Sequence, residues 1–281
     1  MFYYSDSQLD QWLMDDIALG DLTTRCMGIG SKPGRMAYSY RQTTRTSGVE
    51  VAARLLRKCG LNVEQLVEDG QDVEAGTTLI LADGRADQLH SGWKVTQNIM
   101  EWSGGVATYM ARMLEAARAV NPALHIACTR KSIPGTKTLA NAAVVHGGGI
   151  IHRGGTAETI LLFANHRCFT DSPADFAAHI AKLKSAAPEK KVIVEADTMD
   201  EAKEALKARP DVLQLDKFTP ADIEAMVKMA ADSAPGCLIS MAGGLNKDNI
   251  ADYARTGAHL AVTSAPYYAK PVDVKVRMEK R

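Results

Sequence analysis

Residues 191–216 read KVIVEADTMDEAKEALKARPDVLQLD, and this stretch decides the fold class of the chain. Its two ends, at 191–197 and 212–216, are short apolar runs typical of buried strands, and a helix pattern lies between them. Apolar strands joined by a helix of this length are typical of a parallel sheet that is covered on both faces. The stretch therefore predicts an α/β fold.

The same alternation of short apolar runs and helix patterns continues through the second half of the chain. Counting the two strands above, the expected strands lie at 125–129, 143–147, 159–165, 191–197, 212–216, 237–243 and 259–265. Strands of this number predict a barrel or near-barrel, and an open doubly wound sheet is the alternative.

The first 95 residues or so have a different organisation and predict an α+β module. An amphipathic helix with Leu9, Leu13 and Ile17 on one face is expected to end at Gly20 and to lead into a turn at 21–24. After it we expect a strand at 35–43, a helix at 49–59, and short antiparallel strands within 61–82, where glycine-bearing turns follow one another closely.

A long helix pattern at 92–120 contains Ser103-Gly104-Gly105 in its interior. Because glycine in a helix costs about 1 kcal/mol relative to alanine, this spot indicates either close backbone packing or a break between two helices. It is also a natural boundary between domains. The last residues, 271–281, are expected to form a strand that returns to the first module.

Composition excludes several function classes. The 281 residues carry 33 Lys+Arg and 33 Asp+Glu, without the basic excess of nucleic-acid binders and polybasic membrane-surface proteins. The five cysteines form no CxxC pair, which suits reduced thiols. The N-terminal stretch does not have the form of a signal peptide, and no apolar run approaches the ~18–20 residues of a membrane span. We therefore expect a soluble, cytoplasmic protein.

Polar residues gather where the predicted strands end, which is where parallel α/β barrels place their working residues. Early strands supply the cations Arg130 and Lys131, after Thr129, and the pair His152-Arg153, and glycine clusters lie nearby at 147–149 and 154–155. Forked cationic donors beside glycine-rich backbone favour binding of a polyanion over a solvated turn. Lys131 as a Schiff-base lysine is an alternative.

Later strands supply acids and a second glycine pair. Gly243-Gly244 precedes a helix expected near residues 246–248, a typical phosphate site, with a plain tight turn as the alternative. Glu195 and Asp216 then suit sugar hydroxyls or Mg²⁺, unless Asp216 forms a buried ion pair with Lys217. The histidines at 146, 152 and 166 do not have zinc-site spacing, so a histidine metal site is not expected.

Together these motifs resemble the quinolinate phosphoribosyltransferase (nicotinate-nucleotide pyrophosphorylase) family, and within it the branch found with molybdate transport genes. The matching motifs, in order along most of the chain, are DDIALGDLTT (15–24), SGGVAT (103–108), TRKSIPGTK (129–137), GGGIIHRGG (147–155), VEAD (194–197), LQLDKF (213–218) and AGGLN (242–246). The ending TSAPYYAKP (263–271) resembles that branch in particular.

The resemblance implies an N-terminal α/β sandwich, residues 1–103 joined by the tail 268–281, followed by an incomplete α/β barrel, 104–267, that holds the active site. It also implies a homodimer in which one subunit lends residues to the other's site. The implied reaction joins a pyridine acid to 5-phosphoribosyl pyrophosphate (PRPP) with Mg²⁺, losing pyrophosphate and carbon dioxide.

The motifs also carry implied roles. Thr129, Arg130, Lys131, His152 and Arg153 would bind the acid; Glu195 and Asp216 would face the ribose and Mg²⁺, and act with Lys131 in catalysis; Ala242, Gly243, Gly244, Thr263 and Ser264 would bind the phosphoribosyl group. This sequence departs from the family pattern at four positions. Trp102 replaces an arginine that the family gives to the neighbouring subunit's site, and Phe163 replaces a lysine. Ala242 replaces a serine, and Thr263 replaces a glycine.

Two of these departures bear on the substrate. Each charge-assisted carboxylate contact is worth about 1.5–3 kcal/mol, so aromatic rings at 102 and 163 would cost roughly 10²–10⁴ in affinity for a dicarboxylate. The leading hypothesis is therefore a PRPP-dependent phosphoribosyltransferase for a nitrogen heterocycle with fewer carboxylates than quinolinate. One alternative is a genuine carboxylating quinolinate phosphoribosyltransferase of NAD biosynthesis, and another is a non-catalytic anion-binding protein linked to molybdate uptake.

Overall fold

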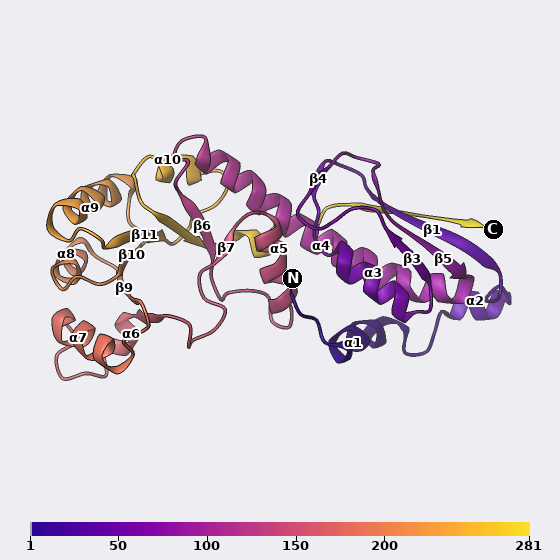
Figure 1. Cartoon of the computed structure of the whole chain (residues 1–281), viewed down its shortest axis with the longest axis horizontal. Coiled ribbons are helices and arrows are strands. Elements are labelled where there is room, and N and C mark those ends of the chain that lie inside the picture. Colours follow the sequence, from indigo (N-terminus) through magenta and orange to yellow (C-terminus); the bar gives the residue numbers. More distant parts are fainter. Residues whose placement is uncertain (1) are drawn as a thin grey trace. The chain divides into compact units, whose positions relative to one another are not determined.

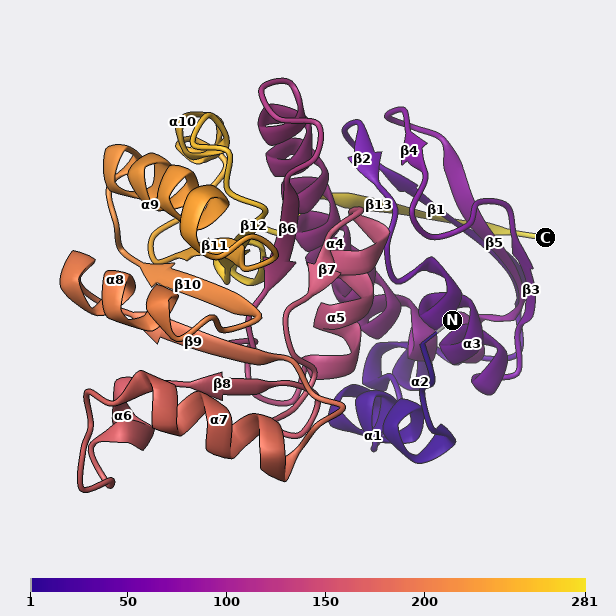
Figure 2. The same cartoon turned by 60° about the vertical axis from the view of Figure 1, so that its left-hand side comes forward.

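A computed structural model describes residues 2–281, which divide into two compact units. The first unit contains the chain up to Ala111 together with 133–148 and 266–281, and the second contains 112–132 and 149–265. Figures 1 and 2 give two views of the chain. Among the described residues, no helix has the combined length and apolarity needed to cross a membrane.

The first unit is an α/β sandwich built on a four-stranded antiparallel sheet of order β13-β1-β5-β3. Its helices and strands are α1 (Asp6–Ile17), α2 (Leu22–Met27), β1 (Pro33–Tyr40), β2 (Thr44–Arg45), α3 (Val49–Lys58), β3 (Asn62–Gln65), β4 (Asp72–Val73), β5 (Thr78–Arg85), α4 (Ala86–Arg118, which continues into the second unit), α5 (Lys137–His146), a 3-10 turn (Ala265–Tyr268) and β13 (Val274–Lys280). The tail strand expected from the sequence is thus present and pairs with β1.

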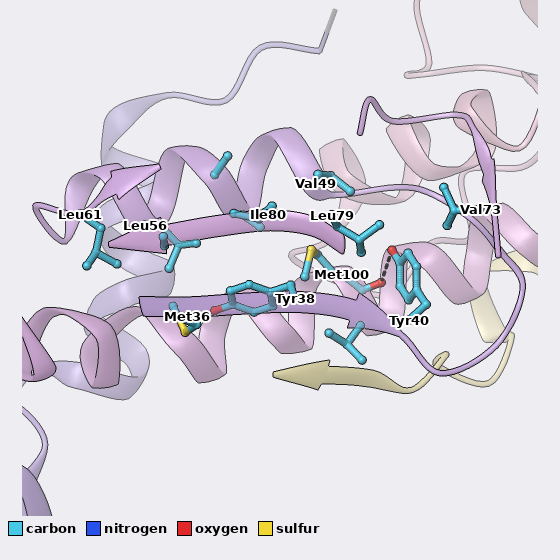
Figure 3. Packing of buried hydrophobic residues seen from close by; sticks show 14 of the residues in the cluster. Met36, Tyr38, Tyr40, Val49, Leu56, Leu61, Val73, Leu79, Ile80 and Met100 are labelled. Atoms are coloured by element: carbon cyan, nitrogen blue, oxygen red, sulfur yellow. Dashed lines mark hydrogen bonds between the residues drawn. The ribbon is translucent and has the colours of Figure 1, made fainter. Parts of the chain in front are cut away.

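Strict alternation along β1 builds the core of this unit. Met36, Tyr38 and Tyr40 point to one face and are fully buried, and they pack with side chains of β5, α3 and α4 (Figure 3). The phenol of Tyr40 donates to the carbonyl oxygen of Met100 on α4, at 3.5 Å (Figure 3). The buried sheet face therefore fixes α4 against the strands.

Helix α4 passes through the predicted break at 103–105 without interruption. A Cβ at position 105 would lie 2.5 Å from the carbonyl oxygen of Lys270, and one at position 104 would lie 2.9 Å from the Tyr40 hydroxyl. Of the two interpretations of this Ser-Gly-Gly stretch, close backbone packing is therefore confirmed and a helix break is wrong.

The second unit is a curled sheet of seven parallel strands, an incomplete barrel, in the order β7-β6-β12-β11-β10-β9-β8. Its elements are β6 (His125–Cys128), β7 (Ile150–Ile151), β8 (Ile160–Leu162), α6 (Ala164–Arg167), α7 (Phe176–Ala186), β9 (Val192–Ala196), α8 (Met199–Lys207), β10 (Val212–Asp216), α9 (Pro220–Ser233), β11 (Leu238–Ala242), α10 (Ile250–Ala254) and β12 (Leu260–Thr263). Helices α7, α8 and α9 run along one face of β9 to β11 (Figure 2).

Three local predictions were wrong. Residues 143–147, expected as a strand, belong to helix α5, because Leu139, Ala140 and Ala143 form one buried helical face; the seventh strand is β7 instead. The turn expected at 21–24 is the start of helix α2, because the Asp21 side chain accepts the Thr24 N–H and caps it. The strand expected through residue 165 ends at Leu162, and α6 follows.

Candidate active site

A cavity of about 510 Å³ lies at the carboxyl ends of the strands of the incomplete barrel. Its lining includes thirteen of the fourteen residues that the sequence singled out: Thr129, Arg130, Lys131, His152, Arg153, Phe163, Glu195, Asp216, Ala242, Gly243, Gly244, Thr263 and Ser264. They meet because every parallel strand ends at the same rim of the sheet. The cavity therefore has cations from the early strands on its wall together with acids from β9 and β10.

Backbone bonds hold the cationic part of the wall in place. The Thr129 N–H donates to the Thr263 carbonyl at 2.9 Å, and the Thr129 hydroxyl accepts the Lys131 N–H at 3.1 Å, which fixes the turn that carries Arg130. The His152 N–H donates to the Cys128 carbonyl at 2.9 Å and extends the β6–β7 ladder. Arg153, only 7% exposed, thus reaches the cavity from the end of β7.

His152 is an uncharged part of this wall. Burial, reinforced by the neighbouring Arg153, lowers its pKa to about 4, so the imidazole is neutral at physiological pH. Its Nε2 is buried and has no partner among the described residues. Because a buried polar atom without a partner costs about 1–3 kcal/mol, this nitrogen is suited to a hydrogen bond with a ligand.

The acidic part of the wall is arranged around Glu195. Gln214, its neighbour in the β9–β10 register, donates from Nε2 to Glu195 Oε2 at 2.6 Å. Burial raises the pKa of Glu195, the Gln214 bond opposes this, and the negative charges of Asp216 and Asp197 raise it further. A second anion is therefore unfavourable here, whereas hydroxyl groups or a developing positive charge are favoured.

Asp216 does not form the buried ion pair that was the alternative to a ligand role. Lys217 Nζ lies 3.6 Å from Asp216 Oδ2, but the lysine side chain is 80% exposed. The backbone of Lys217 is left-handed, with φ 59°, an unusual conformation for a residue with a side chain. Its N–H donates to the Ala242 carbonyl at 2.8 Å, which ties the end of β10 to the loop after β11.

The loop after β11 has the form of an anion cradle. Gly243 and Gly244 both have positive φ, of 89° and 74°, and a Cβ at 244 would meet nothing within 4 Å. The Thr263 hydroxyl donates to the Leu245 carbonyl at 2.7 Å and holds the loop to β12. Successive backbone N–H groups in such a turn form a concavity for an anion.

The helix expected near 246–248 begins later, at Ile250, and is only five residues long. The reason is that the Asn246 side chain accepts the Asp248 N–H and the Asn249 side chain accepts the Asn246 N–H, so these residues form turns. The loop backbone, rather than a helix N-terminus, is the part suited to phosphate.

Phe163, which follows the edge strand β8, adds an aromatic surface to the lining of the cavity. Its ring stacks on His166, with centroids 5.6 Å apart and planes 27° from parallel, and the Arg153 guanidinium carbon lies 5.9 Å from the ring centroid. The Phe163 N–H donates to His166 Nδ1 at 3.1 Å, which fixes the stack. The wall here offers a flat π surface beside a cation.

Some predicted features are not part of this cavity. Trp102 lies on α4 in the first unit, half-buried against the apolar cluster around Leu9 and Leu13. The glycine clusters do not line the cavity: Gly147 and Gly148 end helix α5, and the Gly154 N–H donates to Glu158 at 2.6 Å. The expectation that these glycines cradle the polyanion is not supported.

The sequence interpretation missed Gln214, which lines the cavity and holds Glu195. The signal was available, because residues 214 and 216 alternate and therefore share a face of β10. Among residues 2–281, no group of three or more His, Cys, Asp or Glu side chains is placed to hold a metal ion.

Comparisons with known proteins identify the family and agree with this fold. Two family profiles match almost the whole chain: Quinolinate phosphoribosyl transferase, N-terminal domain, over residues 21–104, and the C-terminal domain of the same family over 106–277. The chain is 48% identical over 279 residues to "Putative pyrophosphorylase ModD" of Escherichia coli O6:H1, covering 99% of this chain and 98% of that protein. It is 45% identical over 281 residues to the protein of that name from Pasteurella multocida, covering 100% of both.

A solved structure shares the fold. The nicotinate-nucleotide pyrophosphorylase from Francisella tularensis superposes with a TM-score of 0.88 at 23% identity, covering 99% of this chain and 98% of that one. The two family profiles and the full-length relatives confirm, at the level of the family, the resemblance found in the sequence motifs. The chain belongs to the quinolinate phosphoribosyltransferase family of pentosyltransferases, with close similarity over its full length to the proteins named ModD.

Proposed function

We propose that the protein transfers the 5-phosphoribosyl group of PRPP to a ring nitrogen of a heterocycle with fewer carboxylates than quinolinate. The observation that carries this proposal is the position of Phe163, an uncharged ring in the lining of the cavity beside Arg153. A dicarboxylate needs a cation for each acid group, and here an aromatic face occupies part of that wall.

The two parts of the cavity wall suit the two substrates. Arg130, Lys131 and Arg153 bind an acid group and the pyrophosphate, and the Gly243–Gly244 loop binds the 5-phosphate. Neutral His152 offers its buried Nε2 to the acceptor ring or its acid group. Glu195 and Asp216 bind the ribose hydroxyls.

The same groups account for the chemistry. The acceptor nitrogen forms a bond to the anomeric carbon while the bond from that carbon to the pyrophosphate oxygen breaks, and pyrophosphate leaves with the electron pair. Positive charge develops on the ribose in this step, and the carboxylates of Glu195 and Asp216 stabilise it. Lys131 and Arg130 stabilise the charge that accumulates on the leaving group.

Mg²⁺ fits this site as an ion carried largely by the substrate. Two carboxylates, Glu195 and Asp216, line the cavity, and Mg²⁺ is commonly held by one or two carboxylates together with substrate phosphates. Bound there, Mg²⁺ would neutralise pyrophosphate charge. We also propose a homodimer in which Trp102 of one subunit completes the site of the other.

The proposal is tested by incubating the protein with PRPP, Mg²⁺ and a panel of pyridine mono- and dicarboxylates and other nitrogen heterocycles, and measuring pyrophosphate release. We expect release with a monoacid and none with quinolinate. Release with none of the acceptors would contradict phosphoribosyl transfer, and efficient release with quinolinate, supported by calorimetric binding below millimolar concentration, would establish the carboxylating alternative. Glu195→Gln is the control, because it removes the carboxylate and keeps the Gln214 contact geometry.

A further inference from the structure

A second cavity, of about 640 Å³, adjoins the candidate active site within the same unit. The two cavities share Arg130, Arg153, Leu161 and Phe163 in their linings, so they meet at the acceptor end of the site. Neither of the two acids nor the Gly243–Gly244 loop contributes to the second cavity. The second cavity therefore extends away from the residues proposed to bind the phosphoribosyl group.

Beyond the shared residues, the second cavity has an apolar wall formed by Ile160 and Leu162 from β8, Leu183 from α7 and Ala187 just after that helix. Polar side chains also line it: Thr156, Thr159, Asn165, His166 and Lys190. β8 is an edge strand of the incomplete barrel, with β9 as its partner, so the opening in the sheet is what leaves room for this space. Apolar walls beside two guanidinium groups fit a ligand with an acid group at one end and an apolar body.

Phe163 forms the junction between the cavities. Its ring is held by the stack on His166 and by the bond from its N–H to His166 Nδ1, and Arg153 lies close to it. A lysine at this position would place a charged, strongly hydrated group at the junction. The phenyl ring makes the junction a surface over which an aromatic ligand can extend.

The second cavity also contains one polar group without a protein partner. Thr159 lines it, and the Thr159 Oγ1 is buried and makes no hydrogen bond among the described residues. An unpaired buried hydroxyl costs about 1–3 kcal/mol, so a ligand group that bonds to it regains that cost. The Thr159 hydroxyl therefore favours a ligand that places a hydrogen-bonding group in this part of the cavity.

We propose that the acceptor is an extended monoacidic heteroaromatic compound, larger than a single pyridine ring. Its acid group binds at Arg130 and Arg153, and its apolar extension passes over Phe163 into the second cavity, where one polar group bonds to Thr159. This inference rests on the proposed function, since it identifies the class of acceptor for the same site. A pyridine monocarboxylate alone would leave the second cavity to solvent.

Equilibrium binding tests the inference without requiring turnover. Calorimetry on the full chain compares pyridine-3-carboxylate with a series of quinoline monocarboxylates and of aryl- and hydroxyalkyl-substituted pyridine monocarboxylates. We expect at least one extended acid to bind about tenfold more tightly than pyridine-3-carboxylate, since each buried apolar group adds appreciable affinity. Equal affinities across the series would overturn the inference.

Two variants locate the effect. Ala187→Leu fills the second cavity and is expected to abolish the preference for the extended acid, while Ala186→Leu, at the neighbouring exposed position, keeps it. Thr159→Val keeps the shape of the side chain and is expected to weaken binding of a hydroxyl-bearing extension about fivefold, with an unchanged or higher thermal midpoint. A preference that survives Ala187→Leu would contradict the inference.

The outcomes separate this inference from the proposed function. Absence of pyrophosphate release with every acceptor, together with tight binding of an extended acid, would contradict the transfer reaction and leave the second cavity as a binding site. Release with pyridine-3-carboxylate, together with no preference for an extended acid in binding, would support the transfer reaction and overturn the present inference.

Discussion

Burial of the Glu195 carboxylate, together with the negative charges of Asp216 and Asp197, raises its pKa above the ordinary 4.5. For an acid whose pKa is raised by folding, the folded state binds more protons than the unfolded state as pH rises through this range. Stability therefore falls as pH increases from about 4.5 through the folded pKa, and at neutral pH the ionised group costs stability. Such a cost at a site residue is expected where function rather than stability selects the side chain.

We therefore expect Glu195→Gln to unfold at higher urea concentration than the wild type at pH 7.5, with the difference shrinking below pH 4.5. Pyrophosphate release should fall by about 10²-fold, because a group that stabilises transition-state charge is lost. Urea titrations at both pH values and a pyrophosphate assay measure the two effects. A variant less stable than the wild type at neutral pH would contradict the account of Glu195.

Gly243 and Gly244 are adjacent and both have positive φ, yet their surroundings differ. A Cβ at 243 would lie 2.8 Å from the Lys217 backbone nitrogen and 2.9 Å from Asp216 Oδ1, whereas a Cβ at 244 would meet nothing within 4 Å. Gly244→Ala should cost about 1–2 kcal/mol from the left-handed backbone alone. Gly243→Ala should cost more and should also displace Asp216.

The two glycine variants are therefore a matched pair. We expect the thermal midpoint to fall further in Gly243→Ala than in Gly244→Ala, and the dissociation constant for PRPP to rise at least about tenfold more, because only the first change moves a site carboxylate. Differential scanning calorimetry and calorimetric titration measure both quantities. Equal losses in the two variants would mean that the packing of Gly243 against β10 is unimportant.

At the scale of elements, helix α4 depends on backbone contact inside the first unit. In an exposed helix, replacing glycine with alanine stabilises by about 1 kcal/mol. At position 105 a Cβ would lie 2.5 Å from the Lys270 carbonyl oxygen and 3.1 Å from the Pro271 Cα, both backbone atoms that a rotamer change cannot move. Replacing Gly105 with alanine should therefore destabilise the protein instead of stabilising it.

We expect Gly105→Ala to lower the free energy of unfolding by about 1–3 kcal/mol, in the range of overpacked core sites, as measured by urea denaturation. The control is Ser185→Ala on the exposed part of α7, where the change should be within about 0.5 kcal/mol. A stabilising effect of Gly105→Ala would show that the tail segment at 270–271 is not packed against α4.

The local sequence pattern predicts a helix or a strand reliably where its periodicity fits only one of the two. Strands β9, β10 and β11 are apolar on both faces, lie between clear helices and were predicted within one or two residues. The run AVVHG at 143–147 has the same local pattern but is helical. The residues that reveal the helical period, Leu139 and Ala140, lie before this run, so the run alone does not distinguish a helix from a strand.

The polar residues of the site were predictable for a topological reason, because parallel strands end together. Glu195 and Asp216 could be placed on one rim once β9 and β10 were recognised. What could not be predicted depends on loops: the left-handed backbone of Lys217, the stack of Phe163 on His166, and the unpaired hydroxyl of Thr159. These arise from three-dimensional packing that leaves no periodic mark in the sequence.

At the scale of the whole molecule, the proposed homodimer gives Trp102 a place in a second subunit's site. Trp102 belongs to the first unit, whereas the cavity lining lies in the second. A residue on one unit and a site on the other are what a head-to-tail pair of subunits can combine. If so, a subunit lacking Trp102 and a subunit lacking Glu195 each carry the part that the other needs.

Trp102→Ala and Glu195→Gln should each lose activity alone and recover it together. In co-expressed, randomly assembled dimers, half would be mixed and one site in each mixed dimer would be intact, so about a quarter of wild-type pyrophosphate release should return. The control pair is Lys131→Ala with Glu195→Gln, which should recover nothing, because both residues line the cavity of one subunit. Activity no higher than the mean of the two parent variants would mean that each site is completed within its own chain.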